Sequence, residues 1–157
     1  MEILKKGEKA PQFSLKDKDG NVYRLKDTSS EYTVLFFYPK DSTPGCTIEA
    51  KEFSDAAATF NRRKIRLIGI SGGDQKSKTK FCEKHNLKVS LVSDSDFAVS
   101  TAYGVYGEKK FMGRVFDGIH RTTFIINKAG KILHVFEKVK PAGHADEVLG
   151  VIKSLQE

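Results

Sequence analysis

The chain has 157 residues, of which 39% are hydrophobic and 30% are charged, a composition that excludes a disordered or fibrous protein. Its net charge of +7 comes from lysines that alternate with acids along every segment, which indicates a solvated surface and no nucleic-acid partner. The N-terminus has no apolar signal region, and no apolar run approaches the roughly 20 residues that span a bilayer, so we expect a cytoplasmic protein without a membrane segment.

The first half of the chain predicts a hairpin, two buried strands and a helix. Turn residues at 17–21 separate short strand-like runs at 13–15 and 22–25. A nearly unbroken apolar run at 32–38 suits a strand covered on both faces, and 65–70 is a second one. Between them, apolar residues recur at steps of four and three, as in an amphipathic helix: Cys46, Ala50, Phe53, Ala57 and Phe60.

The second half begins with a polar helix over 74–86, with Asp74 as its N-cap and Asn86 as a left-handed stop. A short strand at 91–92 and a short helix at 97–103 follow. The chain then predicts a hairpin of strands 122–126 and 132–136 and a last helix over 141–155. This order favours an α/β, thioredoxin-like fold in one domain over residues 1–157, with a central mixed sheet flanked by helices and an N-terminal β-hairpin extension.

Cys46 lies where a buried strand passes into a helix. The segment 38–46 reads Tyr-Pro-Lys-Asp-Ser-Thr-Pro-Gly-Cys, with Thr43 placed to cap the helix and Pro44 at its first position. Cys46 then falls in the first turn, where unpaired backbone N–H groups and the positive end of the helix dipole favour a thiolate. The alternative is a small apolar residue at the head of the buried stripe.

Pro39, Thr43 and Cys46 stand at a spacing that resembles the active-site motif of peroxiredoxins, and residues 37–49 resemble the version found in the bacterioferritin-comigratory-protein (PrxQ) subfamily. Residues 103–110, Tyr-Gly-Val-Tyr-Gly-Glu-Lys-Lys, and 118–126, Gly-Ile-His-Arg-Thr-Thr-Phe-Ile-Ile, are similar to the family pattern in order and spacing. The resemblance covers nearly the whole chain. It implies a thiol-dependent peroxidase that reduces hydrogen peroxide and organic hydroperoxides.

The resemblance also implies a role for each matching residue. Cys46 would be the peroxidatic cysteine, and Arg121 would stabilise its thiolate and polarise the peroxide. Thr43 would hydrogen-bond the peroxide, Pro39 would shield the site, and Glu49 would support Arg121 through an ion pair. The structural alternatives are a helix cap for Thr43, a strand end for Pro39, an ion pair with a neighbouring strand for Arg121 and a solvated helix position for Glu49.

A sulfenic acid on Cys46 must condense with a thiol before it is oxidised further. Many PrxQ proteins carry the resolving cysteine five positions after the peroxidatic one, but that position is Lys51 here. Cys82, in the helix over 74–86, resembles the resolving cysteine of a second PrxQ subtype. That helix has few apolar residues, so we expect it to unwind and allow a Cys46–Cys82 disulfide. The alternative is a one-cysteine peroxiredoxin that uses an external thiol.

The resemblance implies peroxide substrates, thioredoxin or a glutaredoxin-like protein as reductant, and neither a metal nor an organic cofactor. The four histidines have no metal-ligand spacing with either cysteine. Because the resolving thiol would lie in the same chain, we expect a monomer.

Residues 69–73 read G-x-S-x-G between a strand and a helix, which would make Ser71 the nucleophile of a serine hydrolase. The chain is small for an α/β-hydrolase, and a turn explains the glycines. The absence of C-x-x-C argues against a thioredoxin-like reductase. A non-catalytic binding module is the remaining alternative.

Overall fold

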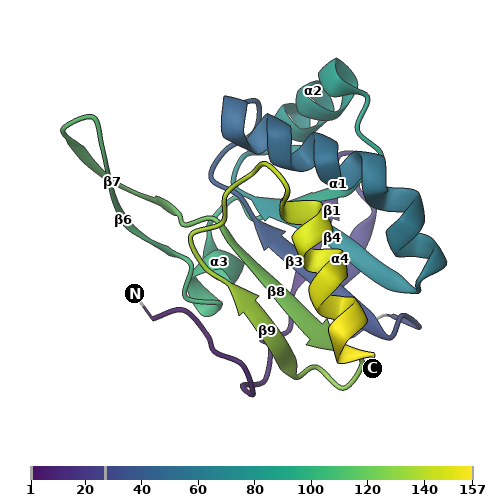
Figure 1. The fold of residues 1–157 in the computed structure, drawn as a ribbon. Coiled ribbons are helices and arrows are strands. Elements are labelled where there is room, and N and C mark those ends of the chain that lie inside the picture. Colours follow the sequence, from purple (N-terminus) through teal and green to yellow (C-terminus); the bar gives the residue numbers. More distant parts are fainter. Residues whose placement is uncertain (1, 27, 157) are drawn as a thin grey trace.

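The computed structural model describes residues 2–26 and 28–156, so both ends of the predicted domain lie outside the described residues. The strands, in chain order, are β1 (Ser14–Asp17), β2 (Val22–Arg24), β3 (Tyr32–Phe37), β4 (Ile65–Ser71), β5 (Ser90–Ser93), β6 (Tyr106–Phe111), β7 (Arg114–Ile119), β8 (Thr122–Asn127) and β9 (Ile132–Phe136). The helices are α1 (Pro44–Arg62), α2 (Gln75–His85), α3 (Ala98–Ala102) and α4 (His144–Leu155). Figure 1 shows their arrangement around the main sheet.

The main sheet has the strand order β2-β1-β5-β4-β3-β8-β9. It is mixed, because the central strand β3 pairs in parallel with β4 and antiparallel with β8. The β1–β2 hairpin extends the sheet through the antiparallel pairing of β1 with β5. The predicted fold class, a mixed sheet flanked by helices with an N-terminal hairpin, is confirmed.

Strand β3 is buried on both faces, as its apolar run predicts. Val34 and Phe36 pack in a core cluster with α1, α2 and α4, whereas Leu35 and Phe37 pack in a second cluster with β8 and the segment after α3. Helices α1 and α4 lie over the first of these faces (Figure 1). The start of α1, which follows β3 in the chain, therefore lies beside a packed core.

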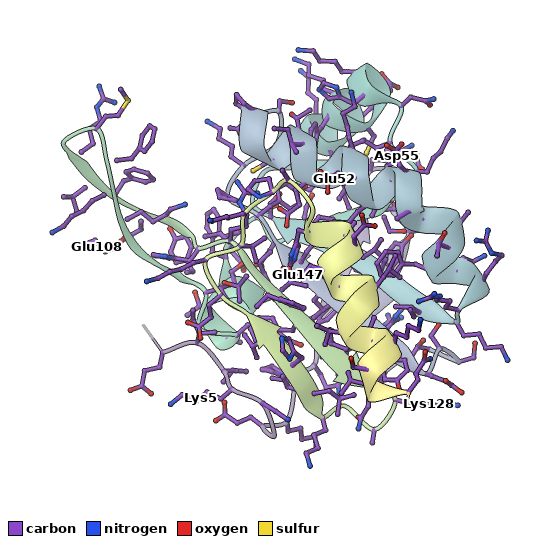
Figure 2. The ribbon with its side chains drawn as sticks, viewed as in Figure 1. Lys5, Glu52, Asp55, Glu108, Lys128 and Glu147 are labelled. Atoms are coloured by element: carbon purple, nitrogen blue, oxygen red, sulfur yellow. The ribbon has the colours of Figure 1, made fainter. Side chains whose placement is uncertain are left out.

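The hairpin of β6 and β7 differs from the sequence-based expectation, which assigned no strands to residues 106–119. The two strands pair antiparallel from Tyr106 opposite Ile119 to Phe111 opposite Arg114. They form a separate sheet that projects from the body of the molecule, with Glu108 labelled on it in Figure 2. The run of three charged residues at 108–110 and the scattered glycines leave no regular strand pattern in this part of the sequence.

The ends of the helices show where local sequence rules hold. Helix α2 is capped as predicted, since the Asp74 carboxylate accepts a hydrogen bond from the Ser77 backbone N–H (2.8 Å) and Asn86 is left-handed at φ 49°. The prediction that the last helix begins at 141 is wrong. Gly143 adopts φ 82°, which is not helical, and α4 begins at His144. The Gly143 N–H instead donates to the Glu52 carboxylate on α1 (2.9 Å), which is labelled beside the start of α4 in Figure 2.

Across residues 2–26 and 28–156, none of the helices combines the length and the apolar character that crossing a membrane requires.

Candidate active site

Cys46 occupies the first turn of α1, as the sequence predicts. Pro44 opens the helix and Thr43 is the N-cap residue, with an extended backbone at φ −85° and ψ 154°. Backbone N–H groups in a first helical turn lack intrahelical partners and carry partial positive charge. The Cys46 side chain is only 1% exposed, so its sulfur lies at this positive helix end within the core.

Arg121 supplies a full positive charge at the same sulfur. Its Nη2 lies 3.4 Å from Cys46 Sγ, and it comes from the segment just before β8. The pairing of Thr122 with Phe37 on β3 brings that segment beside the start of α1. A Cβ atom at Gly45 would lie 3.1 Å from Arg121 Nη2, so the glycine leaves room for the guanidinium.

Glu49 holds the other side of the Arg121 guanidinium. Its Oε1 accepts a hydrogen bond from Arg121 Nη1 at 2.7 Å, and the residue is 1% exposed. Burial raises the pKa of the Glu49 carboxyl to about 7, although the Arg121 charge opposes this shift. Its Oε2 is buried and has no hydrogen-bond partner among the described residues. The geometry agrees with the ion pair that the sequence suggested and not with a solvated position.

Thr43 and Pro39 lie beside a groove of about 750 Å³ that reaches Arg121. The Thr43 hydroxyl donates to the Lys40 carbonyl (2.9 Å), and its side chain makes no capping hydrogen bond, unlike the cap that the sequence suggested. Its oxygen lone pairs therefore remain able to accept a hydrogen bond. The walls of the groove are largely apolar side chains: Phe97, Phe111, Phe116 and Ile119.

Lys109 is a groove residue that the sequence did not single out. Its Nζ donates to the Ile119 carbonyl at 2.9 Å. Burial and the nearby Arg121 charge lower the pKa of its ammonium, whereas Cys46 raises it. The groove therefore holds Lys109 beside Arg121, and further charged side chains line it together with the apolar ones: Lys40, Asp41, Lys110 and Asp117.

Cys82 lies on α2, 6% exposed, in the same core cluster as Cys46. Both thiols are free in this structure. Burial raises the pKa of the Cys82 thiol, while the charges of Lys18 and Lys78 lower it. The folded helix therefore keeps Cys82 buried and favours its protonated form.

A buried polar network next to Cys82 was not foreseen. Lys78 on α2 is fully buried, and its Nζ donates to Asp41 Oδ2 (2.9 Å), Ser71 Oγ (2.8 Å) and the Gly72 carbonyl (2.7 Å). In the sequence it is one lysine among several in a polar helix. Its spacing of three and four positions from Phe81 and Cys82 was the available signal that it shares their buried face.

The network also accounts for Ser71. The side chain is fully buried, donates to the Gly72 carbonyl (3.1 Å) and accepts from Lys78. No described groove or cavity is lined by Ser71. This geometry gives no access to a hydrolase substrate. No group of histidine, cysteine, aspartate and glutamate side chains suited to a metal ion occurs in the described part of the chain.

The chain resembles known proteins over nearly its whole length. The model of the AhpC/TSA family matches residues 6–135. Peroxiredoxin Bcp of Escherichia coli (strain K12) is 42% identical over 153 residues, which cover 98% of both chains. Peroxiredoxin Bcp of Bacillus subtilis (strain 168) is 40% identical over 96% of both chains.

Solved structures also resemble the chain. A cysteine-to-serine mutant of PrxQ from Xylella fastidiosa superposes with a TM-score of 0.90 at 32% identity, covering 100% of this chain and 99% of that one. The bacterioferritin comigratory protein of Xanthomonas campestris, whose structures address its alkyl peroxide reduction activity, gives 0.85 at 35% identity over 92% of both chains.

Proposed function

The chain belongs to the AhpC/TSA family and is a thiol-dependent peroxidase, a peroxiredoxin of the Bcp/PrxQ type, and from this premise we propose that Cys46 is its peroxidatic residue. The observation that carries the proposal is the Arg121 guanidinium, which bridges Cys46 Sγ and the Glu49 carboxylate. A thiolate at this position has a positive charge on one side and the start of a helix on the other. Both lie where they would attract the negative charge of the attacking sulfur.

The groove suits the first chemical step. The Cys46 thiolate attacks one peroxide oxygen, so that an S–O bond forms and the O–O bond breaks. The departing oxygen leaves as hydroxide or alkoxide, develops negative charge beside Arg121 and is protonated to water or an alcohol. The Thr43 oxygen accepts a hydrogen bond from the peroxide O–H, and Pro39 limits the access of water. Cys46 is left as a sulfenic acid.

Cys82 is proposed to resolve this sulfenic acid. Its thiol condenses with the Cys46 sulfenic acid, which releases water and leaves a Cys46–Cys82 disulfide. Because both side chains are buried on different helices, α2 must unwind first, and unwinding also exposes Cys82 to water where its thiol ionises more easily. An external thiol acting directly on Cys46 is the competing route.

The disulfide is then reduced by thiol–disulfide exchange, for which we propose thioredoxin or a glutaredoxin-like protein. Because each cycle must return both cysteines to thiols, we propose that the protein works in the reducing cytoplasm. Because all catalytic groups come from one chain, we propose that it acts as a monomer. The two core clusters share the strands of one sheet, which favours a single domain over residues 1–157.

The test is intact mass measurement and non-reducing peptide mapping after one equivalent of hydrogen peroxide. Wild type should give a Cys46–Cys82 link, and Cys82→Ser should stop at a sulfenic or over-oxidised Cys46. Sulfenic acid without a disulfide in wild type would assign resolution to an external thiol. A Cys46 that does not react promptly would contradict its peroxidatic role.

A further inference from the structure

Helix α2 is attached to the core through few side chains. Its buried residues are Lys78, Phe81 and Cys82, which share one face at spacings of three and four. The rest of the helix is polar and largely exposed. One of the three buried attachments is therefore the charged side chain of Lys78.

Lys78 is held as tightly as an ammonium group allows. An ammonium has three N–H donors, and each has a partner within 3 Å: Asp41, Ser71 and Gly72. The ion pair with Asp41 is almost dry, with the two side chains 0% and 4% exposed. Removing one member of a buried ion pair leaves the other charge uncompensated. Mutation of either residue therefore strongly destabilises the folded structure around the pair.

The partner of Lys78 belongs to the loop that carries Cys46. Asp41 lies between β3 and α1, two positions before Thr43. Its carboxylate also accepts hydrogen bonds from Tyr38 Oη (2.7 Å) and from Ser77 Oγ on α2 (2.6 Å). Asp41 is therefore the point at which the helix of Cys82 is tied to the peroxidatic loop.

We propose that the Lys78–Asp41 ion pair is a latch that must break before Cys82 can reach Cys46. When α2 unwinds, Asp41 loses the donors Lys78 and Ser77 together, so the loop at 38–45 loses support as the helix leaves. The latch thus releases both cysteine-bearing segments in one opening and sets how often Cys82 is exposed. Lys78 and Asp41 are positioning residues, and this inference rests on the proposed role of Cys82 in resolution.

The first experiment measures the opening without peroxide chemistry. In a Cys46→Ser background Cys82 is the only thiol, and its labelling rate by Ellman's reagent under native conditions reports its exposure. Lys78→Met should label at least roughly tenfold faster than the parent. The matched control, Lys80→Met, removes the same charge from an exposed position of the same helix and should label at the parental rate.

Hydrogen exchange on the same proteins tests whether the two segments open together. Peptides covering 38–50 and 75–86 should both exchange faster in Lys78→Met than in the parent. In Lys80→Met neither peptide should exchange faster. Asp41→Asn, which keeps the shape of the carboxylate, should show the same pattern and serves if Lys78→Met does not fold. Equal labelling of the Lys78 and Lys80 variants overturns the latch, and so does faster exchange confined to 75–86.

With both cysteines present, Lys78→Met should accelerate disulfide formation after a peroxide pulse and reduce over-oxidation of Cys46. Faster labelling with an unchanged rate of disulfide formation overturns the latch as a step in resolution. Faster labelling of Lys78→Met supports the latch. If neither wild type nor Lys78→Met forms a disulfide after the peroxide pulse, the result counts against the resolving role of Cys82. Failure of the inference and failure of the proposed function are therefore distinguishable.

Discussion

At the scale of single residues, Glu49 connects the chemistry of the site to the stability of the fold. Its carboxyl is almost fully buried, bonds Arg121 through one oxygen and leaves the other without a partner among the described residues. Burying a charge costs free energy that one ion pair repays only in part. The position is therefore explained by what it does for Arg121 and Cys46, and not by a gain in stability.

The raised pKa of Glu49 gives a pH dependence whose sign is fixed. Its pKa rises from 4.5 to about 7 on folding, so the free energy of unfolding is highest below pH 4.5, where the carboxyl is protonated in both states, and falls as pH rises through 7. Relative to Glu49→Gln, wild type should lose roughly 3 kcal/mol of unfolding free energy between about pH 4.5 and 8. Urea unfolding of both proteins across that range measures the difference. Parallel pH profiles would contradict the shift.

At the scale of elements, the projecting β6–β7 hairpin forms one wall of the groove. Phe116 lines the groove, whereas its neighbour Val115 does not. Phe116→Ser should raise the KM for an aromatic hydroperoxide such as cumene hydroperoxide by roughly tenfold, because apolar contact is lost. The KM for hydrogen peroxide, which has no apolar part, should stay unchanged. Val115→Ser is the control on the same hairpin. An equal rise of KM in both variants would contradict a specific contact between Phe116 and the aromatic hydroperoxide.

Elements with strong local signals were predictable from the sequence. The caps of α2 and the buried run of β3 depend on neighbouring residues and were confirmed. The β6–β7 hairpin was missed because its charged residues and glycines follow no regular strand pattern. The start of α4 was misplaced because Gly143 adopts a left-handed conformation, so the helix begins only at His144.

The candidate site depended on long-range contacts. The approach of Arg121 to Cys46 was expected only from the family resemblance, since 75 positions separate the two residues. The pairing of Lys78 with Asp41 was not foreseen, because 37 positions separate the two residues; the helical spacing of Lys78 from Phe81 and Cys82 indicated only the face it shares with them.

At the scale of the whole molecule, Phe53 joins α1 to the sheet and to α4. Its fully buried ring stacks on Phe36 at 4.4 Å and meets His144 edge-on at 5.6 Å. Phe53→Ala should lower the unfolding free energy by about 3–5 kcal/mol, because it opens a cavity where these elements meet. Urea denaturation checks this value. Phe111→Ala, at a side chain 66% exposed, should change stability by less than about 0.5 kcal/mol.

The strand pairing that brings Arg121 to Cys46 also governs when the thiol meets this cation during synthesis. A ribosome makes the chain from its N-terminus, so β3 and α1 emerge well before β8. A nascent chain that ends between residues 46 and 120 contains Cys46 but lacks the guanidinium that lies 3.4 Å from its sulfur in the folded protein. The thiol gains that charge only once β8 has paired with β3. The order of translation therefore withholds this positive charge from the cysteine until the sheet that positions it can form.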